Sequence, residues 1–247
     1  MAPLLSLTQV TKRYLDGRRK ILVLDRVSVE IDPGDYVGVW GPRRAGKSTL
    51  LKIAAGMEPP DEGTVCFDGR AVTPMSSRER SWLLRGGGVA LVSSEWRPQV
   101  NRHTVDLVAT ACMSDGTPLH EARRRARRAL ALVDAGEQAY VRADRLALAE
   151  RIRVGLAMAL VREPRLLIVD EPAVLPSPSE SEALYRLLRS LGRGRDIAVV
   201  IASEDLAAIH GARRIMSVSH GAVRSMDEPG VVVPFPERQA RMGDSVL

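Results

Sequence analysis

The stretch that decides the fold reads Gly41-Pro42-Arg43-Arg44-Ala45-Gly46-Lys47-Ser48. It fits the pattern G-x-x-x-x-G-K-[ST], in which the backbone N–H groups of a glycine-rich loop surround a phosphate group. An apolar run fit for a buried strand precedes it at residues 36–40, and a helical pattern follows over residues 48–55. A strand, a glycine turn and a helix in this order predict an α/β unit with a phosphate site at the start of the helix.

The residue types around this loop indicate a site for a nucleotide and a metal ion. Lys47 would neutralise phosphate charge, and the Ser48 hydroxyl is a ligand for Mg²⁺. Asp170 ends an apolar strand, and α/β sheets bind ligands at the carboxyl ends of their strands, so we expect it to complete the metal site. Glu171 is then a candidate general base for the attacking water. The alternative for these two acids is an exposed strand end.

The length and composition of the chain limit the class of protein to which it can belong. The chain has 247 residues, 45% of them hydrophobic and 27% charged, which is typical of a folded protein with one large or two small domains. We expect no membrane-spanning helix, because no apolar run approaches the eighteen or so residues that one needs. Residues 1–8 lack the features of an export signal, which favours the cytosol. Cys66 and Cys112 have no metal-ligand spacing and are expected to be reduced thiols.

The net charge is +6, and most of the basic residues are arginines. A basic surface favours nucleic acid or anionic lipid. The densest cluster, residues 123–128, falls in a helical pattern that places alanine and leucine on another face. We therefore interpret it as a solvated helix face and predict no specific nucleic-acid partner, with nucleic-acid binding as the alternative.

The chain resembles the ATP-binding subunit of ABC transporters over roughly residues 4–225. The two motifs above are separated by a helical pattern over about residues 100–162, as in that family. The segments that carry the resemblance are Val10–Tyr14, Val23–Ser28, Lys47–Leu51, Ala55–Gly63 and Asp170–Pro172.

The resemblance implies an α/β fold: a RecA-like P-loop NTPase core with an N-terminal antiparallel β subdomain and an inserted α-helical subdomain. We expect the core and β subdomain at residues 1–94 and 163–225 and the helical subdomain at 95–162. Residues 226–247 contain several prolines and no clear period, so we expect a C-terminal extension there.

The resemblance also implies that the ligands are ATP and Mg²⁺, with Ser48 and Asp170 as the metal ligands. Tyr14 corresponds to the aromatic residue that stacks on adenine, although a half-buried strand aromatic explains it equally well. The candidate nucleotide-binding residues of the loop and the following helix are Gly41, Pro42, Arg43, Arg44, Ala45, Gly46, Lys47, Ser48 and Thr49.

The segment that departs most from the family is the signature. The family's Leu-Ser-Gly-Gly-Gln, which faces the γ-phosphate of the opposite subunit, is replaced by residues 146–150, Leu-Ala-Leu-Ala-Glu. Ala147 has no hydroxyl to donate, and Leu148 and Ala149 carry Cβ atoms where glycines allow backbone to approach phosphate. Glu150 adds negative charge near a polyanion. We expect this segment to serve a partner's nucleotide poorly.

Other family motifs are altered as well. The glutamine of the glutamine loop is replaced by Ser94, with Gln99 nearby, and the switch histidine by Glu204, which reverses the charge beside a γ-phosphate. The D-loop segment at residues 173–178 lacks the family's Ser-Ala-Leu-Asp, and Arg44 replaces a common glycine.

These changes bear on catalysis more than on binding. Loss of one positioned transition-state donor typically costs about 10²–10³ in rate, so several losses predict weak or partner-dependent hydrolysis, with Lys47 and Glu171 as the catalytic candidates. The resemblance implies a separate integral membrane permease and a second ATP-binding subunit. We expect a heterodimer with a more complete partner, a homodimer being the alternative, at the cytoplasmic face of the membrane. The alternative function is an ATP-dependent switch or scaffold without transport.

Overall fold

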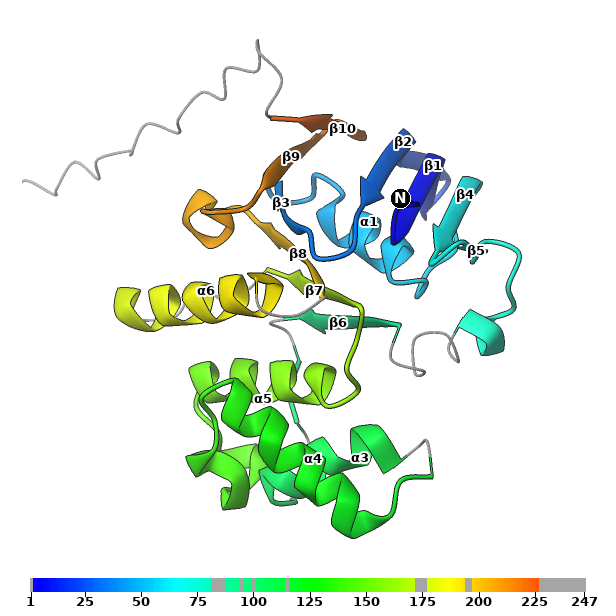
Figure 1. Cartoon of the computed structure of the whole chain (residues 1–247). Helices are drawn as coiled ribbons and strands as arrows, with labels where there is room; N and C mark the ends of the chain where they lie inside the picture. Colours follow the sequence, from blue (N-terminus) through cyan, green and yellow to red (C-terminus); the bar gives the residue numbers. More distant parts are fainter. Residues whose placement is uncertain are drawn as a thin grey trace, which may run out of the picture.

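A computed structural model describes residues 2–80, 88–93, 96–98, 101–113, 116–171, 177–193 and 197–226. Figure 1 labels the main elements. The described strands are β1 (Leu5–Asp16), β2 (Arg19–Ile31), β3 (Tyr36–Trp40), β4 (Glu62–Phe67), β5 (Arg70–Ala71), β6 (Val89–Ser93), β7 (Leu166–Asp170), β8 (Ala198–Ser203), β9 (Arg214–Ser219) and β10 (Ala222–Ser225). The described helices are α1 (Lys47–Ala54), α3 (Thr104–Met113), α4 (Leu119–Leu132), α5 (Leu148–Leu160) and α6 (Pro178–Arg193), with 3-10 helices η1 (Glu137–Tyr140), η2 (Ala143–Arg145) and η3 (Leu206–Ile209).

The central sheet has the strand order β10-β9-β3-β8-β7-β6. Strand β3 pairs in parallel with β8 and β9, and β7 lies parallel between β8 and β6. Every residue of β7 and β8 is buried, which accounts for the apolar runs that precede Asp170 in β7 and Ser203 in β8. Because β3, β7 and β8 run in one direction, their carboxyl ends meet at one edge of the sheet. The loop after Trp40, Asp170 and Glu204 therefore lie at the same edge.

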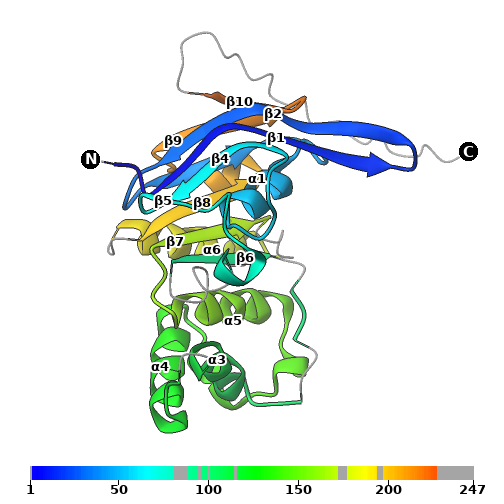
Figure 2. The same ribbon diagram turned by 90° about the vertical axis from the view of Figure 1, so that its right-hand side faces the viewer.

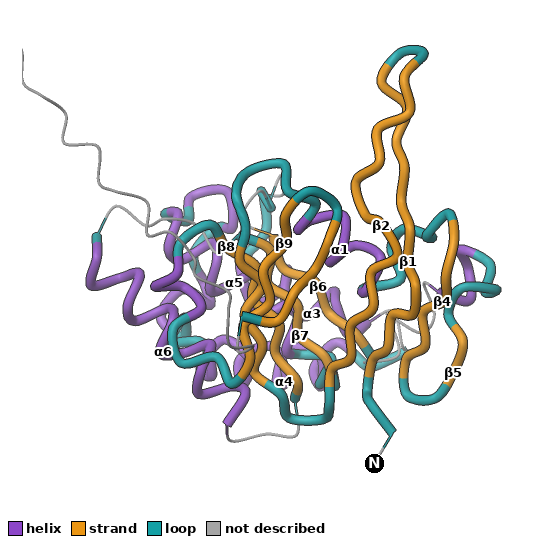
Figure 3. Tube along the Cα trace, turned by 90° about the horizontal axis from the view of Figure 1, so that it is seen from above, coloured by secondary structure: helices purple, strands orange, loops and turns teal. Residues whose placement is uncertain are grey.

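A second sheet, of order β2-β1-β4-β5, is antiparallel. The hairpin of β1 and β2 is long and projects beyond the rest of the chain (Figure 3). Strands β4 and β5 are joined by Asp68 and Gly69, whose φ angles of 50° and 71° are the two left-handed conformations of a type I′ turn. Asp-Gly is the residue pair that this tight turn favours, because both positions need a positive φ.

The helices α3, α4 and α5 pack together on the side of the central sheet away from the antiparallel sheet (Figures 1 and 2). Helix α4 buries Ala122, Ala126 and Leu130 and exposes its arginines. Arg124 and Arg125 both pair with Glu121 of the same helix. The predicted solvated helix face is thus exposed and partly neutralised by its own acid.

The hydrophobic core has two parts, one on each face of the central sheet. Ile168 belongs to the part shared with α1 and the antiparallel sheet, whereas Val169 belongs to the part shared with the helices. Successive side chains of a strand point to opposite faces, so β7 joins both parts. The predicted α/β class, with an antiparallel β subdomain and a helical subdomain, is confirmed.

Candidate functional site

The predicted phosphate loop connects β3 to α1, as the sequence pattern requires. The N-cap of α1 is Gly46, with a φ of 104°, and a Cβ atom there would lie 3.1 Å from the Val23 carbonyl oxygen. The helix has no side-chain cap and no acidic residue in its first turn. Its first backbone N–H groups and the positive end of its dipole are therefore left for an anion.

Lys47 is the first residue of α1, and its almost fully buried side chain reaches back to the start of the loop. Its Nζ donates to the carbonyl oxygens of Gly41 at 2.7 Å and Pro42 at 3.1 Å. The same atom lies 2.9 Å from Glu171 Oε1. The structure thus brings together the two catalytic candidates of the sequence. Glu171 has a φ of 48°, which holds this residue in the left-handed region directly after β7.

Asp170 and Ser48 form the metal-binding candidate. Asp170 is buried at the end of β7, and its carboxylate is hydrogen-bonded to the Ser48 side chain. Burial raises the pKa of Asp170 above its ordinary value, and the Ser48 bond opposes this shift. Within the described part of the chain, Asp170 Oδ1 is buried without a hydrogen-bond partner. A buried, unsatisfied carboxylate oxygen beside a hydroxyl is the donor set that Mg²⁺ prefers, so these residues fit the ion.

Tyr14 lies on β1 beside the start of α1, and its side chain is held by its hydroxyl group. The Tyr14 hydroxyl donates to Glu58 Oε2 at 2.8 Å and lies 3.4 Å from Thr49 Oγ1. Lys12 Nζ lies 3.0 Å from Glu58 Oε1 and 5.5 Å from the centre of the Tyr14 ring. Lys12 and Glu58 both lie in the quoted family segments, but no sequence signal assigned them to the site. Lys12 lies on β1 with Tyr14, whereas Glu58 follows α1, so only the fold brings the three side chains together.

The two arginines of the loop differ in their surroundings. Arg43 Nε lies 3.3 Å from Glu204 Oε1, an ion pair between two residues that no sequence motif links. Arg44 has a φ of 61°, a conformation that glycine adopts without strain. The remaining loop residues form a turn in which the Ala45 N–H donates to the Pro42 carbonyl oxygen at 3.2 Å.

At the signature position, the start of helix α5 is capped by the carboxylate of Glu150 from the same segment. Helix α5 has Ala147 as its N-cap, and the Ala147 N–H donates to Glu150 Oε2 at 2.8 Å. Gln138 Nε2 donates to the other oxygen, Glu150 Oε1, at 3.2 Å. Glu150 therefore satisfies the N–H of the N-cap residue and places its carboxylate at the helix start, where an anion would otherwise bind. The spacing of Glu150 three residues after the N-cap was the sequence signal for this contact.

Several predicted positions lie outside the described residues. These are Ser94 and Gln99 of the glutamine loop, residues 173–176 of the D-loop and residues 227–247 of the C-terminal extension. In the part of the chain that the structure describes, no helix is both long enough and apolar enough to cross a membrane.

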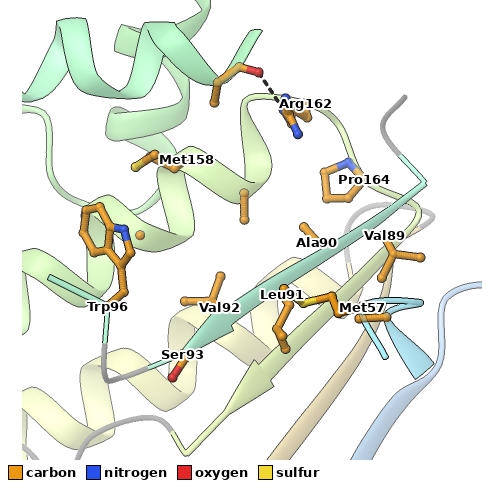
Figure 4. Close-up of a pocket in the computed structure, with 14 residues that line it drawn as sticks. Met57, Val89, Ala90, Leu91, Val92, Ser93, Trp96, Met158, Arg162 and Pro164 are labelled. Carbon is orange, nitrogen blue, oxygen red and sulfur yellow. Dashed lines mark hydrogen bonds between the residues drawn. The ribbon is translucent and has the colours of Figure 1, made fainter. Parts of the chain in front are cut away.

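An apolar cavity of about 720 Å³ lies between β6 and α5, away from the phosphate loop (Figure 4). Leu91 and Val92 line it from β6, and Met158 lines it from α5, with Trp96 at one end. At the other end Arg162 Nε donates to the Ala111 carbonyl oxygen at 2.6 Å. The cavity therefore lies at the boundary between the central sheet and the helices.

Comparison with known proteins gives one consistent result. A family model described as ABC transporter matches residues 24–174. The lipoprotein-releasing system ATP-binding protein LolD of Oleidesulfovibrio alaskensis is 32% identical over 213 residues, which are 85% of this chain and 91% of that protein. The methionine import ATP-binding protein MetN of Escherichia coli K12 is 27% identical over 235 residues, 95% of this chain and 68% of that protein.

The structural comparison agrees. A dimeric structure of the ATP-binding cassette MJ0796 bound to ADP and Pi has a TM-score of 0.82 and 25% sequence identity, covering 90% of this chain and 97% of that chain. The architecture is the RecA-like α/β cassette with an antiparallel sheet that the resemblance implied. The motif spacing, the site geometry and both comparisons lead to one conclusion: the chain belongs to the ABC transporter family of ATP-binding subunits.

Proposed function

We propose that this chain binds Mg²⁺–ATP at residues 41–49 and couples the nucleotide to a separate integral membrane permease at the cytoplasmic face of the membrane. The observation that carries the proposal is the open start of α1, with Lys47 buried in the loop and Asp170 at the adjacent strand end. The family and the relatives named above support transport as the role.

Different residues of the site bind different parts of Mg²⁺–ATP. Loop N–H groups and Lys47 bind the phosphates, and Lys47 exchanges its contact with Glu171 for phosphate oxygens. Ser48 and Asp170 would hold Mg²⁺, which would supply positive charge beside the phosphates. Tyr14, held by Glu58, presents its ring to the adenine. Glu171 orients and polarises the attacking water.

We propose that hydrolysis is weak in the isolated chain. The start of α5 is already occupied by Glu150, and Ala147 offers no hydroxyl. A second copy of this segment would therefore contribute little to a γ-phosphate placed against it. This favours a heterodimer in which a partner supplies an intact signature to the nucleotide of this chain. ATP turnover at family-typical rates by the purified chain alone would contradict the heterodimer.

The apolar cavity between β6 and α5 is our candidate contact for the permease. A hydrophobic recess at the boundary of two subdomains can bury apolar side chains of a partner. Met158→Arg should abolish co-purification with an integral membrane protein while leaving ATP binding intact. Met113→Arg is the matched control, because Met113 is exposed and does not line the cavity. Co-purification with a soluble protein alone would favour the alternative switch or scaffold.

A nucleotide titration of Lys47→Ala tests the ATP site. We expect the ATP affinity to fall by about 100-fold or more, because the charge at the centre of the loop is lost. Lys20→Ala, which removes an exposed lysine near the tip of the β1–β2 hairpin, should bind ATP as the wild type does. Equal affinities of the wild type and Lys47→Ala would refute the site.

A further inference from the structure

Arg43 and Glu204 come from different parts of the chain and meet at neighbouring strand ends. Trp40, the last residue of β3, is the register partner of Ser203, the last residue of β8. Arg43 lies in the loop after β3, and Glu204 directly follows β8. Their side chains form an ion pair with Nε and Oε1 3.3 Å apart. The arginine of the loop thus compensates the charge of Glu204, the acid that replaces the family's switch histidine.

The Arg43–Glu204 ion pair is exposed to solvent, so a ligand can reach it and separate the two side chains. The Arg43 side chain is 90% exposed and that of Glu204 40%. An exposed ion pair of this kind is weak, since water and salt screen it. A phosphate group carries more negative charge and accepts two parallel N–H bonds from a guanidinium group, so it is the stronger partner for Arg43.

The backbone at Glu204 is held in place by two hydrogen bonds. Its carbonyl oxygen accepts a hydrogen bond from Trp40 Nε1 at 3.1 Å. The N–H of the next residue, Asp205, donates to Ser203 Oγ at 3.0 Å. Arg43 sits in a turn with a nearly fully exposed side chain, so the arginine is the group that can move.

The location of the pair indicates which part of a nucleotide it meets. Strand β8 lies between β3 and β7, so Glu204 lies on the side of the loop that carries Glu171. The Glu171 N–H donates to the Ala202 carbonyl oxygen at 2.9 Å, which ties the two strand ends together. Tyr14, the candidate adenine contact, instead reaches Thr49 from the antiparallel sheet. The pair therefore lies near the candidate water-activating residue, where the terminal phosphate belongs.

We propose that Arg43 leaves Glu204 to bind the terminal phosphate of ATP and returns to Glu204 when that phosphate is absent. The inference rests on the proposed ATP site and adds a residue pair that distinguishes ATP from ADP. Arg43 is the binding residue, and Glu204 is a positioning residue that keeps Arg43 beside the loop. The acid at position 204 is then part of the nucleotide response rather than an uncompensated charge.

Titrations with Mg²⁺–ATP and Mg²⁺–ADP test the pair. Arg43→Gln should weaken ATP binding by about tenfold and ADP binding by less than about twofold, because only ATP has the terminal phosphate. Arg43→Lys should recover part of the ATP affinity. Glu204→Gln should tighten ATP binding by about threefold with ADP unchanged, because it removes a competing acceptor.

Arg44→Gln is the matched control, since it removes the same charge from the next residue. Among the described residues Arg44 has no ion pair with Glu204, so any loss should be equal for ATP and ADP. The inference is overturned if Arg43→Gln weakens both nucleotides equally or neither, if Arg44→Gln shows the same ATP-selective loss, or if Glu204→Gln leaves ATP affinity unchanged. A wild-type chain that binds neither nucleotide overturns the proposed function as well.

Discussion

The helices α1 and α5 begin in opposite ways. At α1 the N-cap is Gly46, and no side chain caps the first turn. At α5 the Ala147 N–H is already bonded to Glu150 at 2.8 Å. Both helix starts have unpaired N–H groups and a positive dipole end, which attract anions. One carboxylate three residues into α5 thus occupies a backbone donor at the start of that helix, whereas no side chain occupies the start of α1.

Among the changes that test this comparison, the largest effect on ATP binding is expected from blocking the open start of α1. Gly46→Ala places a Cβ 3.1 Å from the Val23 carbonyl oxygen at a φ of 104°, so the loop must change its path. We expect ATP affinity, measured by calorimetry, to fall by about 100-fold, because the loop N–H groups no longer converge.

Gly136→Ala provides the matched control for this change. Gly136 has a φ of −63°, and nothing lies within 4 Å of the Cβ it would gain. It should bind ATP like the wild type. Circular dichroism of Gly46→Ala checks that the variant is folded, and a folded variant with normal affinity would contradict the role of the open helix start.

Removing the metal candidate should have the second largest effect. Asp170→Asn keeps the shape of the side chain but removes its charge, so we expect ATP affinity in Mg²⁺ to fall by about 30-fold. Titration in EDTA serves as the control, and there the two proteins should bind ATP alike. A variant whose affinity still rises on addition of Mg²⁺ as much as the wild type would exclude Asp170 as the ligand.

The raised pKa of Asp170 makes the stability of the wild-type protein depend on pH, and Asp170→Asn removes this dependence. Burial raises the pKa of Asp170 above its ordinary value of 3.8, so the folded protein favours the protonated carboxyl. The stability contributed by this group is therefore lost as pH rises from the ordinary value through the raised one. Without Mg²⁺, the melting temperature of Asp170→Asn relative to wild type should increase over that range. A difference that stays constant with pH would contradict the shift.

Removing the Glu150 cap from the start of α5 should have a smaller effect. We expect it to lower the stability of the fold rather than the affinity for ATP. Glu150→Ala removes the cap at Ala147, which we expect to lower the free energy of unfolding in urea by about 1 kcal/mol. Glu137→Ala is the control, because Glu137 lies in the nearby η1 and has no hydrogen bond to the start of α5 among the described residues. Equal losses from both variants would show that Glu150 acts only as a surface charge.

The smallest effect is expected at the Lys47–Glu171 pair. Glu171→Gln releases Lys47 from a contact of 2.9 Å, so ATP binding should tighten by about two- to threefold. The measurement is again an ATP titration, at low and at high salt, since the gain should shrink as salt screens the pair. Weaker binding of ATP by Glu171→Gln would mean that the pair supports the loop.

The backbone of the site was predictable from the sequence, whereas its side-chain pairs were not. The pattern of residues 41–48 encodes a strand, a turn and a helix start, and Asp170 follows from the end of an apolar strand. The contacts Arg43–Glu204 and Tyr14–Glu58 join residues far apart in the chain, and no local period reports them. Glu150 lies between these cases, because its spacing from Ala147 predicts the cap only after the helix start is known.

The hydrogen bond from the Trp40 indole to the Glu204 carbonyl has a practical consequence. It places a natural fluorophore beside the charges that the nucleotide rearranges. Indole emission responds to nearby charge and to loss of its hydrogen bond, so occupancy of the loop can be followed optically without a label. The chain has three tryptophans. Replacing the other two with phenylalanine would leave Trp40 as the single tryptophan.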